Sequence, residues 1–267
     1  MPKPKSSLSY FKYLFPSKIE QKIFFLHIPK CGGTSIIDAI ENQYGLAEVI
    51  SRRHFFALNP EAFTKAASIL EEDSVTYRER LLLYYMSSKQ MKCISGHFKY
   101  SEKAMQNFGD DWNFVTLLRH PVSRFFSYYF MDRYADFVPS FAKIDVDLKS
   151  FLNLRRGIYH GCEYVMAFTT GIPLENASSK EAIEEAIDNI NKFSLVGILE
   201  RMDIFYRDYY ELFGAKLKIK RFNTSVLSKQ KQHEMITDEI EQKVRQLCQP
   251  SLEVYNAVKN KILDNQQ

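Results

Sequence analysis

The chain of 267 residues is long enough for one large domain or at most two, because domains commonly have about 100–200 residues. Hydrophobic residues make up 45% of it and charged residues 25%, which excludes a disordered, collagen-like or coiled-coil chain. The 36 Lys and Arg exceed the 32 Asp and Glu by four, and four lysines precede the first acidic residue, Glu20. The surplus charge therefore lies in a basic N-terminal tail, residues 1–18, and the balanced remainder, residues 19–267, does not favour binding to nucleic acid.

The predicted location follows from the tail and from the length of the apolar runs. An exposed tail is the simpler interpretation, and its aromatic residues leave contact with a membrane surface as the less favoured alternative. No apolar run reaches the ~18 residues of a transmembrane helix, and Lys12 interrupts the only run near the start that could be a signal-peptide core. We therefore expect a soluble, cytoplasmic protein. Its four cysteines are far apart and have no histidine at metal-ligand spacing, so we expect reduced thiols and no metal site.

Apolar periodicity, caps and glycines predict alternating strands and helices along the chain. Residues 22–28 are almost continuously apolar, as in a strand buried on both faces, whereas residues 34–44 repeat apolar side chains on one helical face. In chain order we predict a strand at 22–28, helices at 34–44, 60–72 and 76–90, a strand at 92–98, a helix between Ser101 and Gly109, a strand at 113–119, a helix at 121–134, a helical segment at 147–169, a helix capped by Ser178 and ending near 193, a strand at 194–199, a helix ending at Gly214, an edge strand at 216–221 and two helices within 236–264.

This pattern, without internal repeats or a linker, predicts a single α/β domain over residues 19–267, with a central, mainly parallel sheet flanked by helices.

The turn after the first strand has the residues of an anion-binding site. In the segment HIPKCGGTS, residues 27–35, two adjacent glycines lie between a buried strand and a helix. Glycines let the backbone approach a ligand closely, and the N–H groups and dipole at a helix N-terminus favour an anion. Lys30 adds a cation, although the glycines could equally serve only the steric needs of the turn. The order differs from GxxxxGK[ST], because Lys30 precedes both glycines.

The segment PKCGGTS resembles the 5′-phosphosulfate-binding loop of sulfotransferases that use 3′-phosphoadenosine 5′-phosphosulfate (PAPS), in the carbohydrate branch that includes heparan sulfate 2-O-sulfotransferase. Cys31 replaces the threonine that is usual in that loop. The resemblance covers roughly residues 22–226 and implies a P-loop-like sheet, PAPS as cofactor and an acceptor hydroxyl on a glycan or small molecule. It implies that the cofactor contacts of this loop come from Lys30, Cys31, Gly32, Gly33, Thr34 and Ser35.

A second segment, LLRHPVSRFFSYY at residues 117–129, is similar to the 3′-phosphate element of the same family. Arg119 at the end of a strand can direct two N–H donors to a phosphate, and Ser127 on the following helix adds a hydroxyl. Arg124 lies three residues before Ser127, on the same helical face. It either contacts the cofactor or pairs with an acid at the edge of the core. Asn223 and Thr224, in the segment RFNTS, resemble family residues near the adenine and the 3′-phosphate.

The segment ISGHF resembles the family element that supplies the proposed catalytic base, which here is His97. An unperturbed histidine has a pKa of about 6.5 and is partly free base near neutral pH. The resemblance therefore implies in-line transfer with His97 as the base and Lys30 on the leaving phosphate. Glu200 either orients a partner in the site or only complements a helix dipole.

Two other functions remain open at this point. One is a P-loop kinase for a small molecule, and the other is a nucleotide-binding module that keeps the loop without catalysis. The sequence does not indicate the acceptor or the oligomeric state.

Overall fold

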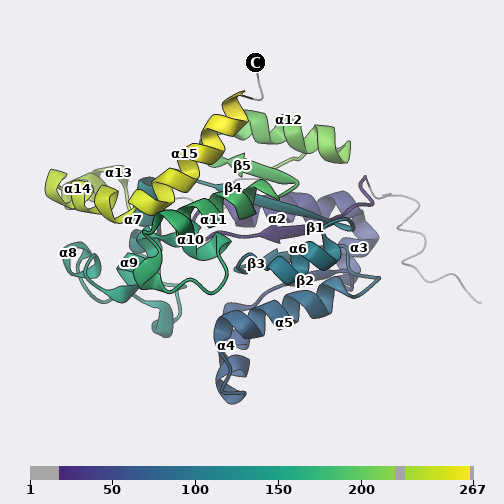
Figure 1. Ribbon diagram of the computed structural model, residues 1–267, viewed down its shortest axis with the longest axis horizontal. Coiled ribbons are helices and arrows are strands. Elements are labelled where there is room, and N and C mark those ends of the chain that lie inside the picture. The colour runs from purple at the N-terminus through teal and green to yellow at the C-terminus, as the bar shows by residue number, and fades with distance from the viewer. Residues whose placement is uncertain (1–17, 220–225, 265–267) are drawn as a thin grey trace, which may run out of the picture.

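The computed structural model describes residues 18–219 and 226–264, and a five-stranded sheet of parallel neighbours lies at its centre (Figure 1). The predicted α/β class and central parallel sheet are thus confirmed. The strands follow the spatial order β2-β3-β1-β4-β5, so β1 is the central one. They are β1 (Lys22–Leu26), β2 (Phe55–Ala57), β3 (Cys93–Gly96), β4 (Trp112–Leu118) and β5 (Leu195–Ile198).

Fourteen helices are described in these two ranges, and they cover both faces of the sheet. They are α2 (Gly33–Glu41), α3 (Leu46–Ser51), α4 (Pro60–Ile69), α5 (Ser74–Met86), α6 (Glu102–Phe108), α7 (Pro121–Tyr134), α8 (Leu148–Phe151), α9 (Arg155–Gly161), α10 (Glu163–Phe168), α11 (Lys180–Asn191), α12 (Met202–Phe213), α13 (Lys229–Met235), α14 (Asp238–Leu247) and α15 (Gln249–Asp264). In Figure 1, α2 lies behind the sheet, while α10, α11 and α15 lie in front of it.

The alternation of side chains along β1 divides the core between the two faces. Ile23 and Phe25 pack with residues of α2 and α12, whereas Phe24 and Leu26 pack with residues of α10, α11 and α15. Successive residues of a strand point to opposite faces, so a central strand between two helical layers must be apolar throughout. A third cluster joins α7, α8 and α14 beside the sheet.

Local signals place most helix ends correctly. Asn59 accepts a hydrogen bond from the Ala62 N–H at 3.0 Å before α4, and Ser101 accepts one from the Ala104 N–H at 3.1 Å before α6. Gly214 ends α12 with φ of 68°, in the left-handed region that favours glycine.

Several predicted elements differ from the structure. The helical segment 147–169 is three short helices, α8, α9 and α10, because a close turn separates α8 from α9: a Cβ on Gly157 would lie 2.1 Å from the Phe151 carbonyl oxygen. The cap of α11 is Ser179 rather than Ser178. Residues 216–219 form no strand: Leu217 and Ile219 pack against the core cluster of α2 and α12, but the segment pairs with no strand of the sheet, and residues 220 and 221 lie outside the described ranges. The sequence analysis missed β2, α3 and α13.

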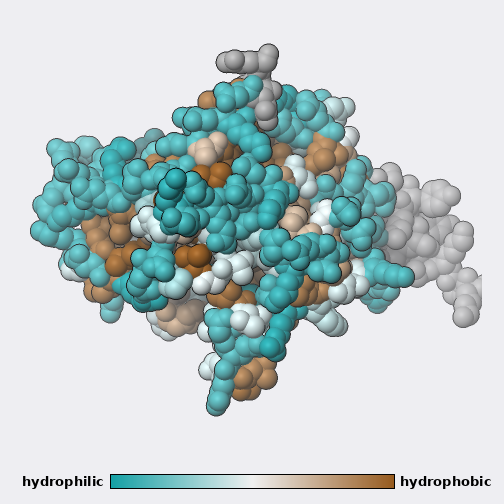
Figure 2. Space-filling model, in the orientation of Figure 1, coloured by the Kyte–Doolittle hydropathy of each residue, from teal (hydrophilic) through white to brown (hydrophobic). Residues whose placement is uncertain are grey.

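The surface is largely hydrophilic in the view of Figure 2, with scattered apolar groups. The largest exposed apolar side chains include Ile69 and Leu70 at the end of α4. None of the helices in the described ranges combines the length and apolar character needed to cross a membrane. Residues 1–17, which make up nearly all of the predicted basic tail, lie outside those ranges.

Candidate functional site

The candidate site lies where the central strands end. Leu26, the last residue of β1, pairs with Gly96 of β3 on one side and Thr116 of β4 on the other. The segments that follow these three strands therefore meet at one edge of the sheet. In open parallel α/β sheets, ligands bind outside the carboxyl ends of the strands.

The turn between β1 and α2 has an unusual backbone. Lys30 has φ of 68° and Gly32 has φ of 81°, so one non-glycine residue is held in the left-handed region. Such strained residues are concentrated at functional sites. Gly33 begins α2, and a Cβ there would lie only 2.2 Å from the His27 ring, which leaves room for glycine alone. The first N–H groups of α2 have no partner within their own helix, as at any helix N-terminus, and the positive end of the helix faces the turn.

The side chains of this turn separate into an inner and an outer set. Thr34 is exposed and Ser35 is half-buried. Cys31 is buried, with 1% of its surface exposed, and its Sγ lies 3.6 Å from the Tyr164 hydroxyl oxygen. Burial raises the pKa of the Cys31 thiol to about 11, so the thiol stays protonated at neutral pH. The Cys31 side chain thus points into the core, and only the backbone of this residue belongs to the turn.

The acid whose charge reaches the Lys30 ammonium group, Asp132, forms its ion pair with Arg156 instead. The Lys30 Nζ lies 2.8 Å from the thioether sulfur of Met131 on α7. A thioether is a weak acceptor, and it compensates a cation poorly. Burial, followed by the charge of Arg119, lowers the pKa of Lys30, and the more distant Asp132 opposes this effect. An anion placed at the turn would therefore gain a charge-assisted contact that the protein itself does not supply.

Arg119 connects the two predicted phosphate-binding segments. Its Nη1 donates to the carbonyl oxygen of Lys30 at 3.2 Å. The hydroxyl of Tyr164, on α10, accepts a hydrogen bond from the Arg119 N–H at 2.9 Å and donates one to the Arg119 carbonyl oxygen. Because the same hydroxyl lies beside Cys31, one buried tyrosine fixes the β1–α2 turn and the end of β4 relative to each other. The sequence analysis missed Tyr164, since residues 119 and 164 form no local pattern.

Arg124 lies beneath the site rather than in it. Its side chain is fully buried, Nη1 lies 3.4 Å from Glu163 Oε2, and Nη2 donates to the carbonyl oxygen of His160. The His160 ring bonds the same carboxylate at 2.6 Å. Burial works against the Glu163 charge, but the attraction of His160 and Arg124 lowers the pKa of Glu163 to about 2. Of the two roles considered for Arg124, the structure therefore favours pairing with an acid over contact with the cofactor.

Of the remaining residues predicted to contact the cofactor, only Ser127 lies within the described residues. Ser127 is half-buried on α7, one turn before Met131, so it shares the helix face that meets Lys30. Asn223 and Thr224 lie outside the described residues.

His97 adjoins the turn between β1 and α2 through His27. The two rings lie 4.6 Å apart between centroids, and His97 Nδ1 lies 2.7 Å from the carbonyl oxygen of His27. A carbonyl only accepts hydrogen bonds, so Nδ1 must carry the proton and Nε2 of the neutral ring keeps its lone pair. Burial lowers the pKa of His97, which favours this neutral form at neutral pH. Nε2 is therefore the basic atom of the ring.

Glu200 forms hydrogen bonds that join three elements of the fold. It lies in the 3-10 turn after β5 (Leu199–Arg201), where Oε1 accepts from the His120 N–H at 2.9 Å and Oε2 accepts from the Tyr255 hydroxyl at 3.2 Å. These bonds join the ends of β4 and β5 to α15. They account for Glu200 without a role in orienting a ligand.

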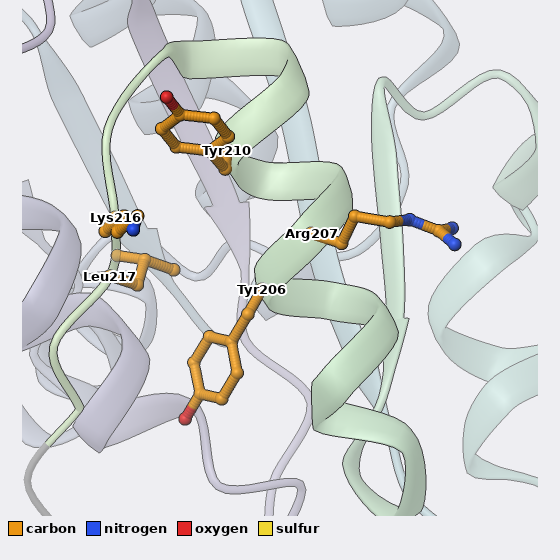
Figure 3. Close-up of a pocket in the computed structure, with 5 residues that line it drawn as sticks. All are labelled: Tyr206, Arg207, Tyr210, Lys216 and Leu217. Carbon is orange, nitrogen blue, oxygen red and sulfur yellow. The ribbon is translucent and has the colours of Figure 1, made fainter.

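A pocket of about 290 Å³ lies elsewhere, between α12 and the segment that follows it. Figure 3 shows Tyr206, Tyr210, Lys216 and Leu217 around it, with Arg207 pointing away. None of the predicted site residues lines this pocket. The candidate site is therefore identified by the segments that meet at the ends of β1, β3 and β4, and not by the pocket. Residues 18–219 and 226–264 contain no group of three or more His, Cys, Asp or Glu side chains arranged to hold a metal ion.

A comparison of the chain with models of protein families finds no match, and a comparison with curated proteins finds none either.

Proposed function

We propose that this protein is a sulfotransferase that moves a sulfuryl group from PAPS to an acceptor hydroxyl, with a carbohydrate as the favoured acceptor. The observation that carries the proposal is the link between its two phosphate-type segments: Arg119 donates to the Lys30 carbonyl, and Tyr164 holds the end of β4 beside Cys31. The residues of both segments resemble those of one enzyme family, in the same chain order, and His97 adjoins the first segment.

PAPS would supply an activated sulfuryl group on its 5′-phosphate. The residues of the turn suit the phosphosulfate end, because Lys30 and the first N–H groups of α2 offer positive charge where negative charge grows on the leaving oxygen. A contact that strengthens as charge develops lowers the barrier rather than only binding the ground state. Lys30, with its thioether neighbour, is therefore assigned to the leaving phosphate.

His97 is assigned to the acceptor side. Its Nε2 takes the proton of the acceptor hydroxyl while the acceptor oxygen bonds to sulfur and the bond from sulfur to the phosphate oxygen breaks. The products are the sulfated acceptor, 3′-phosphoadenosine 5′-phosphate (PAP) and a protonated His97, which returns its proton to solvent. Arg119 and Ser127 are assigned to the 3′-phosphate, at the opposite end of the cofactor from the reacting sulfur. Asn223 and Thr224 join them on the strength of the family resemblance alone.

Two measurements test the proposal together. Transfer of labelled sulfate from PAPS should be detected with at least one member of a panel of sugars, tyrosine peptides and small alcohols. PAP at ~100 times its dissociation constant should add about 2.7 kcal/mol of apparent stability, and AMP, which lacks the 3′-phosphate, should add less. Stabilisation by PAP without transfer would indicate the nucleotide-binding module, and magnesium-dependent consumption of ATP would indicate the kinase. Equal shifts with PAP and AMP would contradict the role given to Arg119 and Ser127.

A further inference from the structure

The pocket beside α12 is lined by side chains that the candidate site does not use. Tyr206 and Tyr210 project from α12 on the side where Lys216 and Leu217, of the segment after the helix, complete the lining (Figure 3). The Lys216 ammonium lies 5.9 Å from the centre of the Tyr210 ring. Tyr206 is 38% exposed and Tyr210 is 49% exposed, so much of two aromatic side chains remains uncovered.

The volume and lining of this pocket favour an aromatic side chain as its occupant. The pocket measures about 290 Å³, at the lower limit of the roughly 300–1,000 Å³ of sites for small molecules. Two aromatic rings and a leucine form most of its lining, and no carboxylate takes part. Aromatic rings pack well against one another when they are offset or meet edge to face.

The first described residues of the chain adjoin this pocket. The Lys18 N–H donates to the carbonyl oxygen of Gln43 at 2.7 Å, and Nε2 of Gln43 donates to the Lys216 carbonyl oxygen at 3.3 Å. Ile19 is buried in the core cluster against which Leu217 packs. A single glutamine therefore connects the start of the described chain to the segment that lines the pocket.

The chain before Lys18 carries an aromatic segment within reach of the pocket. Residues 10–15 read YFKYLF, with four aromatic residues, one leucine and one lysine. They precede Lys18 by three to eight residues, which corresponds to a span of at most about 10–30 Å for an extended chain. This span is long enough to pass Gln43 and enter the pocket. Apolar side chains gain free energy when they leave water, so the segment favours such a contact.

We infer that residues 10–15 bind in the pocket of their own chain, with aromatic side chains packed against Tyr206 and Tyr210. Lys12 can keep its ammonium group in water while its stem covers apolar surface. A short tether holds such a segment at an effective concentration on the order of millimolar, which favours the same chain over a second copy in dilute solution. The inference is independent of the proposed function, because none of the residues assigned to PAPS or the acceptor lines the pocket.

The first test measures how well the tail protects the pocket from a thiol reagent. The four native cysteines are buried, so Lys216→Cys introduces an exposed thiol that N-ethylmaleimide labels selectively. A tail that occupies the pocket about nine-tenths of the time slows this labelling about tenfold. The combined substitutions Phe11→Ser, Tyr13→Ser and Phe15→Ser, called the tail variant, should therefore make labelling about tenfold faster. Tyr84→Cys, at an exposed tyrosine of α5, is the control and should be labelled equally with either tail.

The second test is a double-mutant cycle on thermal unfolding of the full-length protein. The tail variant and Tyr210→Ser should each lower the melting temperature by about 2–4 °C. Their combination should lower it little further, because each change removes the same contact. The control combines the tail variant with Tyr84→Ser, and these two effects should add.

Three results would overturn the inference. The first is equal labelling of residue 216 with either tail, or additive effects of the tail variant and Tyr210→Ser. The second is protection that grows with protein concentration, which would assign the pocket to the tail of a second copy. The third is tail-dependent binding to phosphatidylserine vesicles without tail-dependent protection in solution, which would assign the aromatic residues to a membrane surface.

Discussion

The positively charged side chains beneath the candidate site and those at the site itself differ in their partners. Beneath, Arg124 has a carboxylate from Glu163 and a carbonyl from His160, all shielded from water. At the candidate site itself, Lys30 lies beside a thioether and Arg119 bonds a carbonyl. A buried ion pair stabilises the fold only while both partners are present. A cation that contacts only neutral acceptors can still form a charge-assisted hydrogen bond with a bound anion.

The largest expected effect comes from His97, the proposed base. His97→Ala should reduce sulfate transfer by about 10²–10⁴, the usual contribution of a positioned general base, while PAP still stabilises the fold. The wild-type rate should rise with pH and level off below the ordinary histidine pKa of about 6.5, because burial lowers the pKa of His97 and only the neutral ring accepts a proton. The mutant should lose this dependence. An active mutant with the wild-type pH profile would move the base to another group.

The buried pair should show the next largest effect, on stability rather than on binding. Glu163→Gln leaves the Arg124 charge without its partner and should lower the free energy of unfolding by roughly 3–5 kcal/mol, measured by denaturant unfolding. Replacing both residues, as Arg124→Met with Glu163→Leu, should recover much of that loss. If the double variant recovers nothing, the loss in Glu163→Gln does not come from an unpaired Arg124 charge.

The same pair predicts a pH dependence of stability. The pKa of Glu163 is about 2 in the folded protein and 4.5 in the absence of interactions, so the unfolded chain binds the proton more readily. The contribution is therefore complete above about pH 4.5 and is lost as the pH falls towards 2. The Glu163→Gln variant should show a smaller loss of stability than the wild type over this interval.

Arg119→Ala should act on affinity instead. Removal of a charge-assisted hydrogen bond costs roughly 1.5–3 kcal/mol, so PAP should bind about ten- to hundredfold more weakly, while turnover at saturating PAPS changes little. The control is Arg53→Ala, which removes an exposed arginine elsewhere and should leave PAP affinity unchanged. Normal affinity with a collapsed turnover would place Arg119 at the reacting end.

Tyr164→Phe should give the smallest effect. The variant loses hydrogen bonds to both backbone groups of Arg119, and one such bond contributes roughly 0.5–1.5 kcal/mol. We expect a modest fall in the melting temperature, and we expect the variant to bind PAP several-fold more weakly than the Tyr84→Phe control does. Tyr84 is 71% exposed. An unchanged affinity would mean that the two segments hold their geometry without Tyr164.

The sequence predicts the parts of this molecule that depend on local pattern. The apolar run of β1, the glycines after it and the cap of α6 each leave a signal within a few residues, and the structure contains all three. The sequence left Arg124 open between contact with the cofactor and pairing with an acid, because only the fold shows that this side chain meets Glu163. Tyr164 was missed for the same reason, since its importance arises from contacts between segments far apart in the chain.

The close packing of Gly33 against His27 has a consequence for redesign of this protein. The His27 ring fills the space where a side chain at position 33 would begin, and the same ring lies on His97. Any larger residue at this point of the turn would displace His27 and, through it, His97. Under the proposed function, substitutions at position 33 would therefore also shift the acceptor side, so this position cannot be varied independently of His97 in a mutant library.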